Sequence, residues 1–223
     1  MITVHHLNNS RSQRVLWLLE ELGLDYEVIR YERDAKTMLA PPALRKVHPL
    51  GKSPVISDGD IVVAESGAIV EYLVDVHGQG KLKPRAGSAE QRRYTYWLHY
   101  AEGSAMPPLL MSLVFARLPT QPMPFFVRPV AKGIADKVLT GYIEPQLRQH
   151  LDYLESELKE RDWFAGRKFT AADIQMSFPV EAFAARGGLG RKHARLADWL
   201  QRIHARPAWQ RALERGGPYE LLR

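Results

Sequence analysis

The chain of 223 residues contains no cysteine. This absence excludes disulfide bonds, thiolate metal sites and any mechanism that uses a thiol of the protein itself. Any sulfur chemistry would therefore need a thiol that another molecule supplies.

Long apolar runs are missing as well. No segment approaches the roughly 18 uninterrupted apolar residues of a membrane-spanning helix, and the N-terminus shows no charged start followed by an apolar stretch. The sequence is nevertheless 45% hydrophobic, which is enough for one large domain or two small ones with a real core. We expect a globular cytoplasmic protein without a membrane span.

The sequence has neither a strong charge excess nor a metal-ligand motif. Lys and Arg number 31 against 25 Asp and Glu, a net charge of +6, and the positive residues are scattered. This charge balance weakly favours acidic small molecules as ligands, and it gives no indication of a nucleic-acid partner. His5 and His6 are neighbours in a predicted strand and point to opposite faces, so we predict no metal site.

Two glycine-containing motifs are incomplete. "GKS" at residues 51–53 lacks the earlier glycine of a phosphate-binding loop, because Lys46 stands there, and Pro54 blocks the helix that should follow. "RGGLGRK" at residues 186–192 follows a predicted helix and misses the dinucleotide-binding spacing. We interpret both stretches as turns.

The first third of the chain predicts a small mixed sheet with helices packed on it. Residues 2–6 and 25–31 are typical of strands, and residues 10–22 have the apolar spacing of a helix that Gly23 ends as a left-handed cap. Two further strands, 53–57 and 61–65, flank a hairpin turn at Asp58-Gly59. A second helix, 66–78, follows.

Strand-like alternation stops after Gly78. A polar linker, 79–87, separates a predicted α/β domain, 1–78, from an all-helical domain, 88–223. The predicted helices are 88–118, bent at Met106-Pro107-Pro108, then 127–160, 172–186 and 193–205. Thr170 and Asp173 have capping-box spacing, and we assign them to folding.

The most informative segment, residues 48–73, combines groups that suit a small peptide. A cis bond before Pro54 would expose the backbone of Val55 at a sheet edge, where an extended peptide could pair with it. The Ser66 hydroxyl and the free amides behind it form a carboxylate site. Glu65 could hold an amine and Lys52 a second carboxylate. Glutathione carries these groups.

With these motifs in place, the sequence resembles the glutathione transferase family over nearly its whole length. "HPLGKSP", "AESGAI" and "FTAADIQMSFP" occur in the family's order and spacing. The segments "YERDAKTMLAPPALRKVHPLGKSP", "YAEGSAMPPLLM" and "MPFF" are similar to a fungal branch and its bacterial relatives. The resemblance implies a thioredoxin-like N-terminal domain of βαβ-ββα order and an all-α C-terminal domain.

The resemblance also implies roles for the residues of this segment. Lys52 would contact the glycyl carboxylate of glutathione, Val55 would pair through its backbone with the cysteinyl unit, and Glu65 and Ser66 would hold the γ-glutamyl end. Pro54 would be cis. Glutathione would be the co-substrate, and a homodimer would form through helix 66–78 and the long helices that follow.

The run Asn8-Asn9-Ser10 falls where the family activates the glutathione sulfur, and here the chain departs from the family pattern. Asn9 stands where relatives carry serine or cysteine, and its amide can donate a hydrogen bond to a thiolate. Ser10 offers a hydroxyl, either to the sulfur or as a helix N-cap, and Arg11 adds a positive charge. Donors, helix amides and cations all lower a thiol pKa, so which residue contacts the sulfur stays open.

Three functional hypotheses follow. The first is a detoxifying glutathione transferase that directs the thiolate at small hydrophobic electrophiles, with Tyr100, Met106, Met111 and Phe115 lining the apolar site. The second is glutathione-dependent reduction of disulfides or peroxides, as the resemblance implies for some bacterial relatives with an asparagine at this position. The third is a non-catalytic ligand-binding or partner-regulating protein on the same fold.

Overall fold

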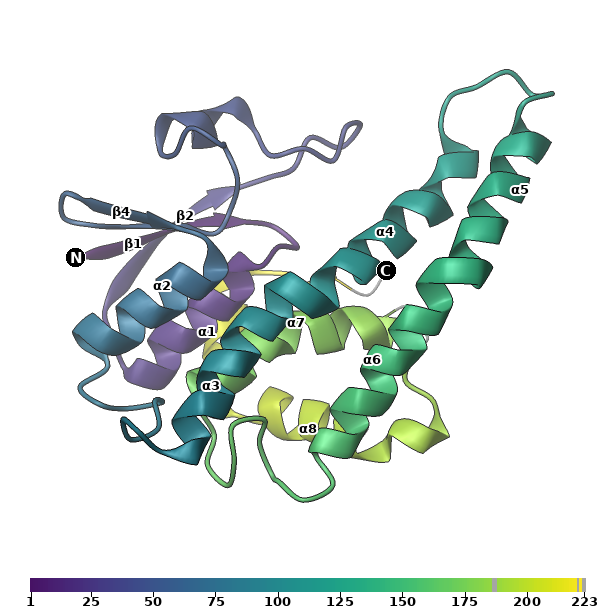
Figure 1. Ribbon diagram of the computed structural model, residues 1–223. Helices are drawn as coiled ribbons and strands as arrows, with labels where there is room; N and C mark the ends of the chain where they lie inside the picture. Colours follow the sequence, from purple (N-terminus) through teal and green to yellow (C-terminus); the bar gives the residue numbers. More distant parts are fainter. Residues whose placement is uncertain (186–187, 220, 222–223) are drawn as a thin grey trace.

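The computed structural model describes residues 1–185, 188–219 and 221 of the chain. Its N-terminal part is a four-stranded sheet with helices packed against it (Figure 1). The elements are β1 (Ile2–Leu7), α1 (Ser12–Leu22), β2 (Tyr26–Tyr31), a 3-10 turn (Pro42–Lys46), β3 (Val55–Asp58), β4 (Ile61–Ala64) and α2 (Ser66–Tyr72), which a π-helical turn (Leu73–His77) extends.

The sheet is mixed, with the strand order β2-β1-β3-β4. β1 and β2 run parallel because α1 connects them, whereas β3 and β4 form the predicted hairpin and run antiparallel to their neighbours. Helix α1 buries its apolar stripe completely, and Gly23 ends it in the left-handed conformation. The expected fold class is confirmed, but α1 begins at Ser12 and not at Ser10.

The C-terminal part is all-helical. Two long helical columns consist of α3 (Ala89–Tyr100) with α4 (Met106–Arg117), and α5 (Arg128–Val138) with α6 (Glu144–Glu157). A π-helical turn interrupts each column, at Ala101–Ala105 and at Leu139–Ile143. Only Met106 separates the first π turn from Pro107 and Pro108, which cannot donate to the regular helical ladder. The predicted irregularity near Met106 is thus present, but it lies one turn earlier.

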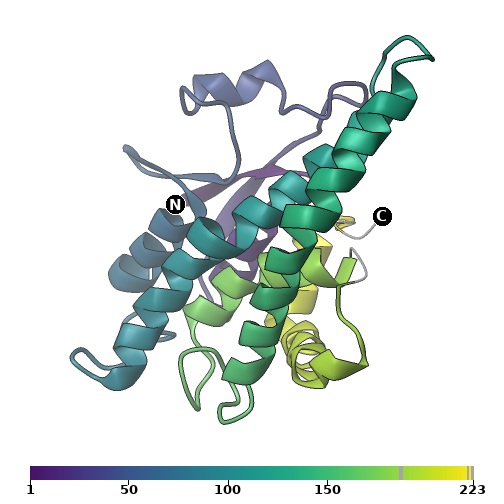
Figure 2. The ribbon, with the colours of Figure 1, turned by 45° about the vertical axis from the view of Figure 1, so that its right-hand side comes forward.

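The remaining helices close the core. They are α7 (Ala171–Ala185), which lies behind α3, α8 (Ala194–His204) and α9 (Pro207–Gly216). The α4 and α5 ends of the two columns project together beyond the rest of the molecule in both views (Figures 1 and 2). Arg186, the last residue of the predicted helix 172–186, lies outside the described residues. The domain limits 1–78, 79–87 and 88–223 stay a prediction.

Helix α9 is absent from the helices that the sequence analysis predicts. It packs on α1, where Arg206 makes two hydrogen bonds to Glu21 at 2.5 and 2.8 Å. Trp209 meets Trp17 edge-on, with the ring centroids 5.0 Å apart. The C-terminal helices are therefore bound directly to the helix that follows the first strand.

Candidate functional site

The β1–α1 loop, residues 8–11, is held in a defined shape by its asparagines. The side chain of Asn8 donates to Glu32 at 3.1 Å and accepts from the backbone N–H of Arg33 at 2.9 Å. Asn9 has a φ of 48°, a left-handed conformation that asparagine tolerates better than most residues. The loop therefore turns sharply at the position that the resemblance assigns to sulfur activation.

Ser10 and Arg11 point in different directions from this loop. Ser10 is buried, and its hydroxyl lies 2.7 Å from that of Ser12 and accepts from the Ser12 backbone N–H at 3.2 Å. Arg11, not Ser10, is the N-cap residue of α1. The Arg11 Nε donates to Glu102 at 3.0 Å, and its guanidinium lies 5.0 Å from the centre of the Phe178 ring.

Ser66 is the first residue of α2 and is joined to a buried ion pair. Its hydroxyl accepts from the guanidinium of Arg14 at 3.0 Å, and the same nitrogen donates to Glu102 at 2.5 Å. Arg14 also donates to the backbone carbonyl of Gln175 at 2.5 Å. Burial would raise the pKa of Glu102, but the charges of Arg14 and Arg11 outweigh it and lower that pKa. Glu102 is therefore held as a carboxylate.

Arg14 and Glu102 were not among the residues predicted from the sequence. A signal for Arg14 was present, because it lies in α1 just before the apolar stripe that begins at Val15. An arginine in a stretch that must be buried needs a partner of opposite charge. No local pattern indicates that this partner is Glu102, which is 88 positions away.

Glu65 and Lys52 present charges to solvent near the start of α2 and before β3. Both are exposed, and Glu65 has a φ of 71°. Across the residues that the structure describes, neither forms an ion pair. The two opposite charges are thus available to a charged ligand. The Ser53–Pro54 bond is cis, which confirms the expectation for Pro54.

The prediction for Val55 is wrong in one respect. β3 is an inner strand, and Val55 is aligned with His5 on β1 and with Ala64 on β4. Because both sides of Val55 are occupied, a peptide cannot add along it as an edge strand. Pro54, the residue before β3, has no N–H, so the nearest backbone outside the ladder that can both donate and accept is that of Ser53, whose hydroxyl donates to the His5 carbonyl at 2.8 Å.

The four predicted apolar-site residues occupy different environments. Tyr100 is buried among aromatic rings of α3 and α6 and shares a short hydrogen bond with His150. Met106 is buried, Phe115 is half-buried and Met111 is exposed. The role of Tyr100 in a substrate site stays a prediction that its burial does not favour, whereas Met111 and Phe115 lie on α4, where a ligand can reach them.

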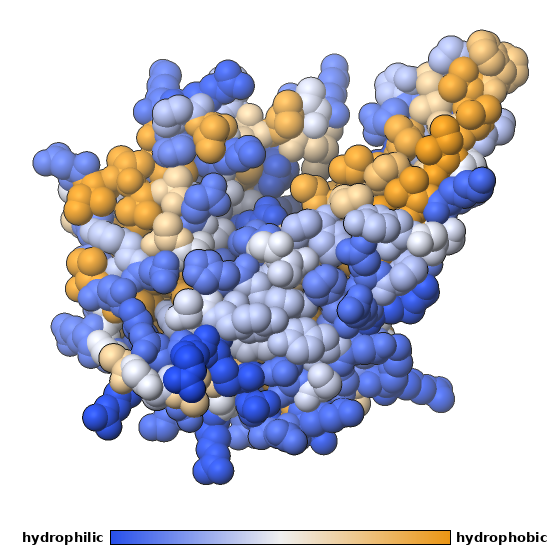
Figure 3. All heavy atoms as spheres, in the orientation of Figure 1, coloured by the Kyte–Doolittle hydropathy of each residue, from blue (hydrophilic) through white to orange (hydrophobic). Residues whose placement is uncertain are grey.

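Apolar side chains are exposed along the projecting helices. Figure 3 shows them over α4 and α5, beside the gap between these helices and the N-terminal part. The exposed large hydrophobic residues of α4 and α5 are Leu110, Met111, Val114, Val130 and Ile134. An apolar surface of this kind marks a binding site or an interface.

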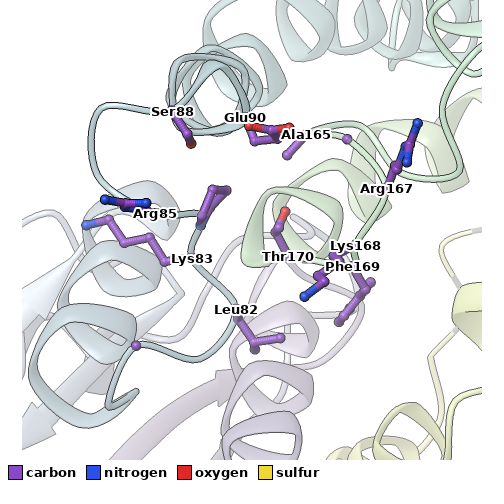
Figure 4. Close-up of a pocket in the computed structure, with 13 residues that line it drawn as sticks. Leu82, Lys83, Arg85, Ser88, Glu90, Ala165, Arg167, Lys168, Phe169 and Thr170 are labelled. Atoms are coloured by element: carbon purple, nitrogen blue, oxygen red, sulfur yellow. The ribbon is translucent and has the colours of Figure 1, made fainter.

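A separate pocket of about 510 Å³ lies between residues 80–90 and 165–170. In Figure 4, Thr170 points into the space between these segments and Arg167 points away from it. The pocket lining includes none of the predicted site residues. The pocket therefore belongs to the junction where α3 and α7 begin and not to the β1–α1 loop.

The described part of the chain shows neither a cluster of metal-binding side chains nor a helix that could span a membrane. Among those residues, His, Asp and Glu side chains form no group of three that could hold a metal ion. His5 and His6 do lie on opposite faces, since His5 contacts Tyr31 and Ser57 while His6 contacts Ser12. Also within these limits, no helix combines the length and apolar character that a membrane crossing requires.

Known proteins with the same fold include glutathione transferases. Glutathione S-transferase 3 of Schizosaccharomyces pombe is 38% identical over 217 residues, which cover 96% of this chain and 88% of that protein. A glutathione S-transferase structure from Actinobacillus pleuropneumoniae matches with a TM-score of 0.83 and 32% identity, covering 100% of this chain and 96% of that one. A glutathione transferase from Phanerochaete chrysosporium in complex with oxidized glutathione matches with a TM-score of 0.75 and 25% identity, covering 96% of each chain.

Family comparison agrees with these relatives. Residues 1–75 match the glutathione S-transferase N-terminal domain, and residues 123–207 match the C-terminal domain of the same family. The resemblance noted from the sequence motifs is therefore confirmed, and the chain belongs to the glutathione S-transferase family.

Proposed function

We propose that this protein binds glutathione, stabilises its thiolate and directs it at small hydrophobic electrophiles. The observation that carries the proposal is the arrangement at the start of α2. There the buried Ser66 hydroxyl accepts from Arg14, and the neighbouring Glu65 offers a negative charge. Lys52 offers a positive charge just before β3, whose first residue pairs with the last residue of β4. Glutathione has a carboxylate at each end and an amine at one of them, so its charges complement this set.

The γ-glutamyl end is assigned to Ser66 and Glu65. A guanidinium can only donate, so Ser66 accepts from Arg14 and its own proton can go to a ligand carboxylate. The amides of the first turn of α2 add donors and a favourable dipole. Glu65 takes the ligand amine, Lys52 takes the glycyl carboxylate, and the backbone near Ser53 pairs with the cysteinyl unit in place of Val55.

The thiolate is assigned to the β1–α1 loop, where Asn9 and Arg11 contribute a donor and a positive charge. Arg33 adds a second positive charge near Arg11: its pKa is lowered by burial and also by repulsion from Arg11, which places the two guanidinium groups close to each other. Positive charge and hydrogen-bond donors stabilise a thiolate over a thiol. The apolar surface of α4, with Met111 and Phe115, supplies the place for the electrophile.

Conjugation of a generic aryl halide tests this function. We expect a glutathione-dependent rate that saturates with glutathione and falls in the Ser66→Ala variant. A rate no higher than the uncatalysed background with several different electrophiles would rule out the proposed transfer reaction.

A second candidate is glutathione-dependent reduction of a disulfide or peroxide. It is favoured by the asparagine at the activating position and by the similar Phanerochaete chrysosporium structure that holds oxidized glutathione. Two glutathione molecules would supply both thiols, because the chain has no cysteine. Disulfide reduction and aryl halide conjugation measured on one preparation separate the two reactions.

We also propose a homodimer. Its support is the exposure of Val76 after α2 and of Tyr96 on α3, elements through which the family pairs. Light scattering should give twice the mass of the 25.4 kDa chain. A cytoplasmic location and a role in detoxification stay predictions.

A further inference from the structure

A buried chain of side chains runs beneath the β1–α1 loop from His6 through Ser12 to Ser10. We propose that this chain of hydrogen bonds points the Ser10 hydroxyl proton toward the protein interior. Ser10 then positions the loop, and the glutathione sulfur receives its side-chain hydrogen bond from Asn9. The identity of the ligand rests on the proposed function, whereas the proton direction rests on the protein alone.

The geometry of the chain is continuous. His6 Nδ1 lies 2.9 Å from the Ser12 hydroxyl, which lies 2.7 Å from the Ser10 hydroxyl. The backbone N–H of Leu7 donates to the Ser12 hydroxyl at 3.2 Å, and that of Ser12 donates to the Ser10 hydroxyl at 3.2 Å. All three side chains are at least 96% buried, so no water competes for these bonds.

The direction of the protons follows from the tautomer of His6. Burial and the nearby charge of Arg30 lower the pKa of His6 to about 4, although a hydrogen bond to the Gly216 backbone opposes this. The imidazole is therefore neutral at pH 7 and carries one proton. A hydrogen bond raises a histidine pKa when the ring is the donor, so the ring donates to the Gly216 backbone. Because Nδ1 faces the Ser12 hydroxyl, we assign the proton to Nε2 and the acceptor role to Nδ1.

The Ser12 hydroxyl has one proton, and it donates this proton to the acceptor Nδ1 of His6 at 2.9 Å. The alternative acceptor, the Leu7 carbonyl, is farther away at 3.3 Å. Because Ser12 donates to His6, Ser10 must be the donor in the 2.7 Å contact between the two hydroxyls. The only proton of Ser10 is then used inside the protein. Ser66 is the opposite case, because its partner Arg14 can only donate.

Nitrogen NMR of the ligand-free protein tests the proton direction without any need for glutathione. We expect the His6 ring to be neutral at pH 7 with its proton on Nε2. A proton on Nδ1 would reverse the chain and overturn the proposal.

The pKa of the bound glutathione thiol, measured from the ultraviolet absorbance of the thiolate, tests the role of each residue. Asn9→Gly removes the amide and keeps the left-handed backbone, and we expect it to raise the thiol pKa by about one or more, the loss of a hydrogen bond to a charge. We expect Ser10→Ala to leave that pKa nearly unchanged. The reverse result would identify Ser10 as the donor and overturn the proposal.

Two His6 variants add a test that does not change Ser10. The His6→Asn variant keeps an acceptor for Ser12, whereas His6→Leu removes it. We expect His6→Leu to raise the KM for glutathione several-fold above the wild-type value. We expect the KM of His6→Asn to stay close to the wild-type value. Equal KM values for the His6→Leu and His6→Asn variants would contradict the positioning role. If calorimetry shows that the wild-type protein does not bind glutathione, the proposed function fails, and the NMR result still decides the direction of the chain.

Discussion

The Arg14 guanidinium donates to the Ser66 hydroxyl at 3.0 Å and links the first helix to the start of the second. The bond crosses 52 positions of sequence and lies in the interior, where Arg14 is fully buried. Glu102 completes the pair from the π turn after α3. One ion pair thus connects α1, the start of α2 and the helical part of the chain.

We predict that Ser66→Ala weakens glutathione binding more than it slows the bound reaction. The variant removes the hydroxyl that we propose as a donor to the ligand carboxylate, and a hydrogen bond to a charged group contributes about 1.5–3 kcal/mol. The KM for glutathione should therefore rise about tenfold or more, with a smaller change in kcat. Steady-state kinetics with varied glutathione checks this, and an unchanged KM would contradict it.

We predict that Arg14→Met destabilises the fold strongly. It removes the buried donor to the Ser66 hydroxyl and to the Gln175 backbone carbonyl, and each buried polar group left without its partner costs about 1–3 kcal/mol. Glu102, which is partly exposed, keeps Arg11 as its cation. Arg11→Met is the matched control, because Arg11 is partly exposed and its pair should contribute about 1 kcal/mol or less. Urea denaturation measures both, and equal losses would show that burial of Arg14 is not the cause.

Much of the N-terminal part could be predicted from local sequence. Gly23 ends α1 because glycine adopts the left-handed conformation readily, and the hairpin at Asp58-Gly59 follows from turn chemistry. Ser66 and Glu65 lie at a strand-to-helix junction, which the sequence shows directly. These features depend on neighbouring residues and so are visible before the fold is known.

Features that depend on distant residues could not be predicted in the same way. The edge placement of Val55 is wrong because the sequence does not reveal that β3 lies between β1 and β4. The partner of Arg14 comes from another part of the chain. Helix α9, in contrast, could have been predicted, because Pro207 precedes apolar residues with helical spacing: Ala208, Trp209, Ala212 and Leu213.

We predict that His6 makes stability depend on pH. Burial, aided by the charge of Arg30, lowers the pKa of His6 from 6.5 to about 4. Between these values the unfolded chain binds a proton that the folded protein does not, so stability rises with pH. The contribution is complete above pH 6.5 and is lost as the pH falls toward 4, by about 3 kcal/mol in total.

The His6→Asn variant isolates this effect, because asparagine does not titrate. The free energies of unfolding of the two proteins, measured from pH 4 to 7, should differ by an amount that changes across this window. Parallel curves would mean that His6 keeps its ordinary pKa in the folded protein.

We predict that Trp209→Ala destabilises the whole protein through the contact between α9 and α1. Trp209 is buried, meets Trp17 edge-on at 5.0 Å and stacks on His204 at 4.9 Å. Truncating a buried tryptophan to alanine costs about 3–5 kcal/mol. Arg211→Ala is the control on the same helix, since its pair with Glu20 lies at the surface and should contribute about 1 kcal/mol or less. If urea denaturation gives equal losses for the two variants, the tryptophan contact does not hold α9 on α1, and the ion pairs of α9 must do so instead.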